Sequence, residues 1–160
     1  MQKAEVITTA LVVTGMVGVY ALIAKYGRMQ KELEVIPTAN VHKFDLKKGL
    51  TLRLDLLMKN PTSGSLKIKF PFVKIYYKDG LVGSSQVVNK DITIPAYGQA
   101  VIEKIMLDLP LTTLLSTAAT LVKALQKKEP VTIVVKAITG IVTGFTEIPL
   151  DKTQEIPLKN

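Results

Sequence analysis

The chain has no cysteine and no tryptophan, and it contains a single histidine, His42, among 160 residues. Without cysteine the fold cannot depend on a disulfide, and no thiolate nucleophile or cysteine zinc cluster is possible. One histidine cannot build a histidine metal cluster, and the carboxylates show no metal-ligand spacing. Because the glycines are spread one per turn, there is no phosphate-binding loop. We therefore expect no enzyme, with no catalytic residue, no metal and no cofactor.

Arginine is also scarce, although the chain is basic. Of 21 basic residues only Arg28 and Arg53 are arginines, and 13 acidic residues leave a formal net charge of +8. Arginine suits bidentate recognition of phosphates and bases, whereas lysine is a hydrated point charge. The composition therefore argues against a sequence-specific nucleic-acid reader. It favours a solvated surface with general attraction to anionic lipid or to an acidic partner.

The sequence does have one long run without charge, from Val6 to Ala24. A helix of this length spans roughly 28 Å, close to the bilayer core of about 30 Å. A cleaved signal peptide and a buried core helix are the alternatives, but a signal peptide has a shorter apolar region and a better cleavage site. We therefore predict a single transmembrane helix, whose membrane-spanning residues include Val6, Leu11, Thr14, Gly18 and Ala24.

Basic residues flank this segment unevenly. Lys25, Arg28 and Lys31 follow it, against Lys3 before it, and these three are candidate contacts for lipid headgroups. The positive-inside rule then predicts a single-pass membrane protein with its domain on the cytoplasmic face. Small residues at four-residue spacing within the run would also allow the helix to self-associate.

The remainder of the chain has the pattern of short strands separated by turns. Apolar residues alternate with other residues from Leu50 to Met58, which predicts a strand with one buried face. Leu57, Ile105 and Leu107 fall at outward-facing positions of their predicted strands, so we expect them to be exposed apolar residues. Further strands are expected at Leu66–Phe70, Val73–Lys78, Leu81–Gly83, Ile92–Ile94, Ala100–Leu109, Val131–Ala137 and Ile141–Ile148.

The spacing of the apolar residues changes in one segment of the chain. From Leu111 to Leu125 apolar residues recur at helical spacing, with Pro110 in the first turn and Glu129-Pro130 as the stop. Short strands with a single late helix predict a mainly β fold, as an antiparallel sandwich or barrel. The expected organisation is a transmembrane helix and short linker in residues 1–34, a β domain in 35–150, and a C-terminal tail in 151–160.

Four short motifs, in this order, resemble a known family. They are Met58-Lys59-Asn60-Pro61, then Ile75-Tyr76-Tyr77-Lys78-Asp79-Gly80, then Val82-Gly83, and then Ile94-Pro95-Ala96-Tyr97-Gly98. They resemble the water-stress and hypersensitive-response domain of group 2 late-embryogenesis-abundant proteins. The resemblance implies an immunoglobulin-like or fibronectin-like β-sandwich, often behind one membrane helix, with no catalytic residues to carry over. It gives structural roles to Asn60, Pro61, Gly80 and Gly98.

Three functions remain open at this point. The first is a membrane-anchored structural tether, whose β-sandwich docks a protein partner or shell, for example in a lipid-containing virion. The second is a lipid-binding or small-ligand-binding module that uses the interior of the sandwich. The third is a stress-protective protein, which the family resemblance implies. The partners expected are the bilayer and either a protein partner or a second copy of the chain.

Overall fold

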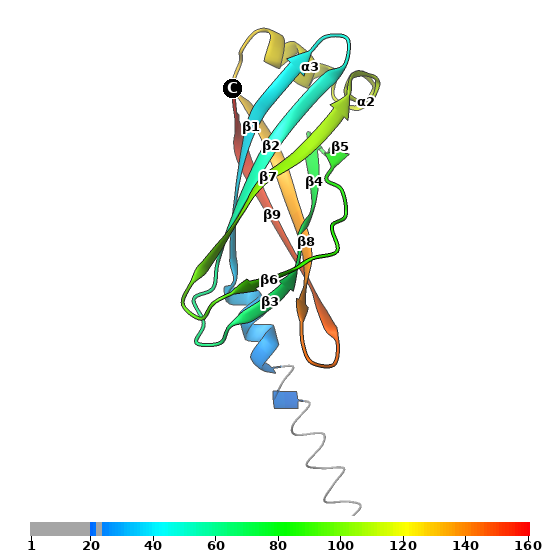
Figure 1. Cartoon of the computed structure of the whole chain (residues 1–160). Coiled ribbons are helices and arrows are strands. Elements are labelled where there is room, and N and C mark those ends of the chain that lie inside the picture. Colours follow the sequence, from blue (N-terminus) through cyan, green and yellow to red (C-terminus); the bar gives the residue numbers. More distant parts are fainter. Residues whose placement is uncertain (1–19, 22–23) are drawn as a thin grey trace, which may run out of the picture. The chain divides into compact units, whose positions relative to one another are not determined.

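The computed structural model describes residues 20–21 and 24–160 (Figure 1). The chain divides into two compact units, Met1–Glu32 and Leu33–Asn160, which are described separately. In the first unit, residues 24–32 are helical, and Lys25, Arg28 and Lys31 are exposed on this helix. The ammonium group of Lys25 lies 6.0 Å from the centre of the Tyr26 ring.

The predicted membrane helix falls largely outside the described residues. Val6, Leu11, Thr14 and Gly18 are not described, and Ala24 is a half-buried residue at the start of the helical stretch 24–32. Among the residues that the structure does describe, no helix is both long enough and apolar enough to cross a bilayer. This finding contradicts the predicted single-pass membrane localisation, which requires such a helix.

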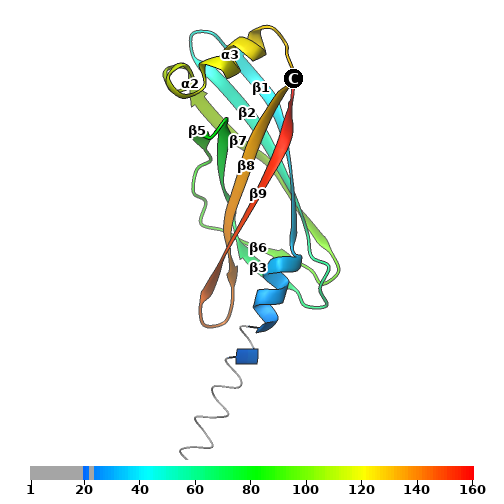
Figure 2. The same cartoon turned by 180° about the vertical axis from the view of Figure 1, so that it is seen from behind.

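The second unit is built from one sheet that curls on itself (Figures 1 and 2). Its main path runs in the order β5-β4-β8-β9-β1-β2-β7, and β3 pairs with β8 and β6 beside this path. Neighbouring strands are antiparallel except for β1 and β9, which are parallel. The strands are β1 Glu34–Asp45, β2 Gly49–Lys59, β3 Leu66–Lys69, β4 Phe72–Tyr77, β5 Gly80–Ser84, β6 Asp91–Ile94, β7 Gln99–Pro110, β8 Val131–Val142 and β9 Glu147–Lys159.

The mainly β prediction is confirmed, whereas the two-sheet, immunoglobulin-like arrangement is not. A sandwich needs two separate sheets, but here the parallel β1–β9 pair joins both halves of the strand set into one hydrogen-bonded sheet. The C-terminal residues explain the difference. Pro149 and its successors, expected largely as a tail, pair with β8 along most of their length as β9.

The core lies on the concave face of the curled sheet and is almost wholly aliphatic. In β2 every second residue is buried, and these side chains are at most 1% exposed: Leu50, Leu52, Leu54, Leu56 and Met58. Burial of each such side chain stabilises the fold by about 1.5–3 kcal/mol. The predicted alternation in this strand is therefore confirmed.

Strand β7 contains a β-bulge that reverses its inward and outward faces. Leu54 pairs with Ile105 and Leu56 with Ile102, so β7 has one more residue than β2 between these pairs. Lys104 takes a left-handed backbone, with φ of 59°, and donates its N–H to Asp55 Oδ1 at 2.7 Å. The predicted exposure of Ile105 and Leu107 was therefore wrong, because both are buried. Leu57, on β2 opposite Val101, is half-buried on the outer face.

Two short helices stand where one was predicted. They are α2 Leu111–Thr117 and α3 Ala119–Gln126, and they meet at the buried Ala118, whose backbone is not helical. The hydroxyls of Ser116 and Thr117 both donate to the carbonyl of Thr113. Such bonds compete with the helical backbone pattern and bend or end a helix. Apolar periodicity alone did not register this break.

Asn60, the residue of the Asn-Pro motif, holds two loops together. It is 1% exposed, and its amide donates to the carbonyls of Gly64 at 2.7 Å and Pro95 at 3.1 Å. Its carbonyl oxygen accepts from the N–H and the hydroxyl of Thr62. Asn60 therefore ties the β2–β3 loop to the β6–β7 turn, which agrees with its expected structural role.

Replacing Asn60 with alanine should lower the free energy of unfolding by about 2–4 kcal/mol. The part-buried carbonyls of Gly64 and Pro95 would lose the hydrogen bonds from the buried Asn60 amide, and each such bond contributes about 0.5–1.5 kcal/mol, with a further cost for a group left unsatisfied. Urea unfolding followed by circular dichroism measures the change. Asn89→Ala, at an exposed position, is the control and should stay within about 0.5 kcal/mol of the parent. A loss below about 1 kcal/mol for Asn60→Ala would contradict the assigned role.

Candidate functional site

One end of the curled sheet gathers several turns and both helices of the second unit, and we call it the helical end. It comprises the β1–β2 turn, the β4–β5 turn, α2, α3 and the last residues of β9 (Figures 1 and 2). The N–H of Leu111 donates to the carbonyl of Lys48 at 3.2 Å, which joins α2 to the β1–β2 turn. The β4–β5 turn is equally close, because a side chain on Gly80 would contact the carbonyl of Thr117.

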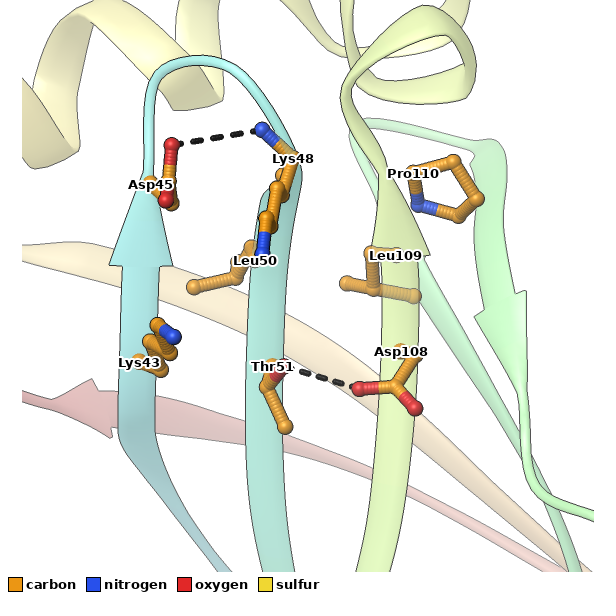
Figure 3. Close-up of a pocket in the computed structure, with 9 residues that line it drawn as sticks. Lys43, Asp45, Lys48, Leu50, Thr51, Asp108, Leu109 and Pro110 are labelled. Carbon is orange, nitrogen blue, oxygen red and sulfur yellow. Dashed lines mark hydrogen bonds between the residues drawn. The ribbon is translucent and has the colours of Figure 1, made fainter.

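An open groove of about 290 Å³ lies at this end, with Gly49 in its lining (Figure 3). Gly49 has φ of +122°, and a Cβ there would collide with the backbone oxygen of Leu109. Only glycine therefore allows β2 to approach β7 and the start of α2 so closely. The groove is lined by Lys43, Asp45, Lys48, Gly49, Leu50, Thr51, Asp108, Leu109 and Pro110.

The groove carries two lysines and two aspartates, which come from β1, β7 and the β1–β2 turn. Lys43 lies opposite Thr51, and Thr51 lies opposite Asp108, so these three side chains form a row across β1, β2 and β7 (Figure 3). The hydroxyl of Thr51 donates to Asp108 Oδ1 at 2.8 Å. Within the described part of the chain, no ion pair forms between these lysines and aspartates.

Asp45 is committed to the turn rather than to a reaction. Its Oδ1 accepts the backbone N–H of Lys47 at 2.7 Å and that of Lys48 at 3.3 Å. The Lys47 hydrogen bond is the largest cause of a lowered pKa at Asp45, and the positive charges of Lys48 and Lys43 act in the same direction against partial desolvation. Asp45 thus stays ionised and is a poor general base near neutral pH.

Lysines dominate the surface of the helical end. Eight exposed lysines face four acidic side chains, so this end holds four uncompensated positive charges, half of the formal net charge of +8. The acidic residues are Asp45, Asp79, Asp108 and Glu129, and the lysines are Lys43, Lys47, Lys48, Lys78, Lys123, Lys127, Lys128 and Lys159.

Ion pairing separates this end from the rest of the second unit. Arg53 pairs with Asp55, Asp91 bridges Lys67 and Lys69, and Lys136 pairs with Asp151 at 3.0 Å. Among the described residues of the helical end, the one such contact joins Lys127 to Glu129 at 3.9 Å. The lysines of the helical end are therefore largely free to meet an external negative charge.

The residues predicted to touch headgroups do not contribute to this groove. Lys25, Arg28 and Lys31 belong to the unit Met1–Glu32, whereas all groove residues belong to Leu33–Asn160. The sequence analysis missed the groove, although Lys43, Lys47 and Lys48 cluster just before a glycine at a strand start. In the residues that the structure describes, no three His, Cys, Asp or Glu side chains are placed to hold a metal ion.

A curled, mainly β sheet closed at one end by two short helices, with a groove lined by charged side chains there, defines the structural class of this protein. The family follows from its sequence. Residues 55–154 match the family model described as late embryogenesis abundant protein, and the chain belongs to this family. The family match does not identify the water-stress and hypersensitive-response domain specifically. A search of curated proteins found no match.

Several solved structures are similar to this chain. A protein from Archaeoglobus fulgidus has a TM-score of 0.51 at 16% identity, covering 80% of this chain and 97% of its own, which shows a shared fold alone. A putative late embryogenesis abundant protein, At2g46140.1, has 19% identity and a TM-score of 0.33 over 95% of this chain and 86% of its own. The Bacillus subtilis sporulation control protein Spo0M has 15% identity and a TM-score of 0.48, covering 81% and 50%. TM-scores below 0.5 carry no argument about this chain.

The lowered pKa of Asp45 predicts an acid-sensitive β1–β2 turn. Because the unfolded chain binds this proton at higher pH, ionised Asp45 stabilises the fold above about pH 4. That contribution should be lost as the pH falls through the lower folded pKa. Urea unfolding between about pH 6 and about pH 2 should therefore give a flatter acid limb for Asp45→Ala than for the parent. Glu155→Ala, which removes an exposed carboxylate of β9, is the control, and an unchanged acid limb in Asp45→Ala would contradict the assignment.

Proposed function

We propose that this chain is a non-catalytic, stress-protective protein of the late-embryogenesis-abundant type. The observation that carries the proposal is the family match over residues 55–154, which covers most of the curled sheet from β2 to β9. Family membership gives the expectation of protection under water stress. The groove chemistry is compatible with it, since Asp45 and Asp108 are held by hydrogen bonds to the turn and to Thr51.

Two physical properties suit such a role. The fold depends on an aliphatic core without disulfides, so it does not change with redox conditions. The outer surface carries an excess of eight positive charges, most of them on lysine. Like-charge repulsion keeps molecules of such a protein apart as solutes become concentrated. A folded, charged protein of this kind can stand between labile proteins and limit their association.

The competing functions gain less support. The tethering and virion hypotheses rested on a membrane helix, and neither the family nor the described fold supports them. A lipid-binding or small-ligand-binding module would use an enclosed apolar interior. The groove that the described residues form is instead open and lined by charged side chains (Figure 3). Stress protection is therefore the function that the observations favour.

A protection assay tests the proposal. A labile tetrameric enzyme such as lactate dehydrogenase is dried or frozen and thawed with this protein, and its residual activity is measured. We expect more residual activity than with an equal mass of lysozyme, another small basic protein, because protection should not come from positive charge alone. Equal protection by both proteins would contradict the proposal.

A further inference from the structure

The helical end presents two kinds of side chain that an external ligand could use together. Its eight lysines are exposed and, with one weak exception, lack an ion-pair partner in the described part of the chain. Three leucines at the same end are also exposed, at 57% for Leu46, 45% for Leu81 and 53% for Leu115. Single exposed leucines are common on protein surfaces, but here three lie at the same end as the unpaired lysines.

The exposed leucines and the lysines lie close to one another in the fold. Leu46 precedes Lys47 and Lys48 at the tip of the β1–β2 turn, and Leu81 follows the β4–β5 turn that carries Lys78. Leu115 lies on α2, which the hydrogen bond from Leu111 to Lys48 joins to the β1–β2 turn. A ligand at this end would therefore contact apolar side chains between the lysines, rather than a surface that is positively charged throughout.

The open groove above Gly49 lies on the same end. It is lined by Lys43 and Lys48, by Asp45 and Asp108, and by the exposed ring of Pro110 (Figure 3). A carboxylate on a short side chain could bind the ammonium groups of Lys43 and Lys48 while its methylene groups contact Pro110. This combination matches an acidic side chain of a polypeptide.

We propose that the helical end is a docking surface for acidic polypeptide segments that carry interspersed apolar side chains. This inference rests on the proposed function, because a destabilised protein exposes apolar segments, and those that also carry acidic residues would be bound here. Charge complementarity selects the acidic segment. The exposed leucines favour a polypeptide over a nucleic acid, since a duplex offers phosphates at its surface and no aliphatic side chains.

Binding is measured by fluorescence anisotropy with a labelled peptide that has glutamate at most positions and leucine at every third. Two further probes accompany it: the same peptide with serine for each leucine, and a labelled 20-base-pair DNA duplex. We expect the leucine peptide to bind more tightly than the serine peptide, and its affinity to fall as salt is added. Equal affinity for both peptides, or tighter binding of the duplex, would overturn the proposal.

Matched variants locate the binding surface. The quadruple variant Lys47→Gln, Lys48→Gln, Lys127→Gln, Lys128→Gln should weaken peptide binding on the order of tenfold at low salt. Its control removes the same charge elsewhere, through Lys59→Gln, Lys67→Gln, Lys90→Gln, Lys104→Gln, and should weaken binding less than twofold. Similar losses in both quadruple variants would show attraction to the whole molecule and would overturn a local site.

The apolar part has its own pair of variants. Leu46→Ser with Leu115→Ser should weaken binding of the leucine peptide and leave the serine peptide unchanged. Val87→Ser with Val101→Ser alters two other exposed apolar residues and should leave both affinities unchanged. Circular dichroism checks that every variant stays folded, and single substitutions replace any pair that does not.

The protection assay separates failure of this inference from failure of the proposed function. If the parent protects lactate dehydrogenase and the Lys47/Lys48/Lys127/Lys128 variant protects it equally, the docking surface is wrong and stress protection stands. If the parent itself does not protect, the proposed function fails whatever the peptides show. If this variant loses both peptide binding and protection while the control variant keeps them, the result supports both the docking surface and the proposed function.

Discussion

The hydrogen bond from the Lys104 N–H to the Asp55 carboxylate stabilises the bulge that determines which residues of the edge strand β7 face the core. Side chains alternate strictly along a strand, so one additional residue sends all later side chains to the opposite face. Because the bulge inserts that residue at Lys104, Ile105, Leu107 and Leu109 enter the core. Leu109 then reaches the space beside Gly83 of β5, where any side chain would collide with it. The bulge thus allows the two ends of the sheet path to approach and the barrel-like curl to close.

The same register determines the helical end. With Leu109 inward, Pro110 faces outward opposite Gly49, and α2 begins where its first N–H can donate to Lys48. The glycine allows this close approach because the space of a side chain at position 49 is taken by the backbone of β7. Turns and helix termini carry polar residues in most proteins, since their backbone is exposed there. Because these turns and helices meet at one end, eight of the lysines lie there. The acidic residues that pair with other lysines lie mostly along the strands.

Local chemistry could be predicted from the sequence where one principle dominated. The alternation from Leu50 to Met58, the Asp79-Gly80 turn and the role of Asn60 each depend on neighbouring residues, and the structure agrees with them. Long-range pairing could not be predicted. The bulge depends on a carboxylate 49 residues away, and β9 depends on pairing with both β8 and β1. The groove was missed for the same reason, since its walls are distant in sequence and meet only through the register of β1, β2 and β7.

The division between strands and helical end also bears on function. Along the sheet, charged residues neutralise one another in pairs such as Lys136 with Asp151. Exposed pairs of this kind contribute little stability, but they hold Arg53, Lys67, Lys69 and Lys136 beside carboxylates of the sheet. At the helical end the lysines lack such partners, and exposed leucines stand among them. A surface that meets acidic, partly apolar segments could use both the lysines and the leucines. The arrangement therefore suits the proposal that this protein would protect through contact with another polypeptide.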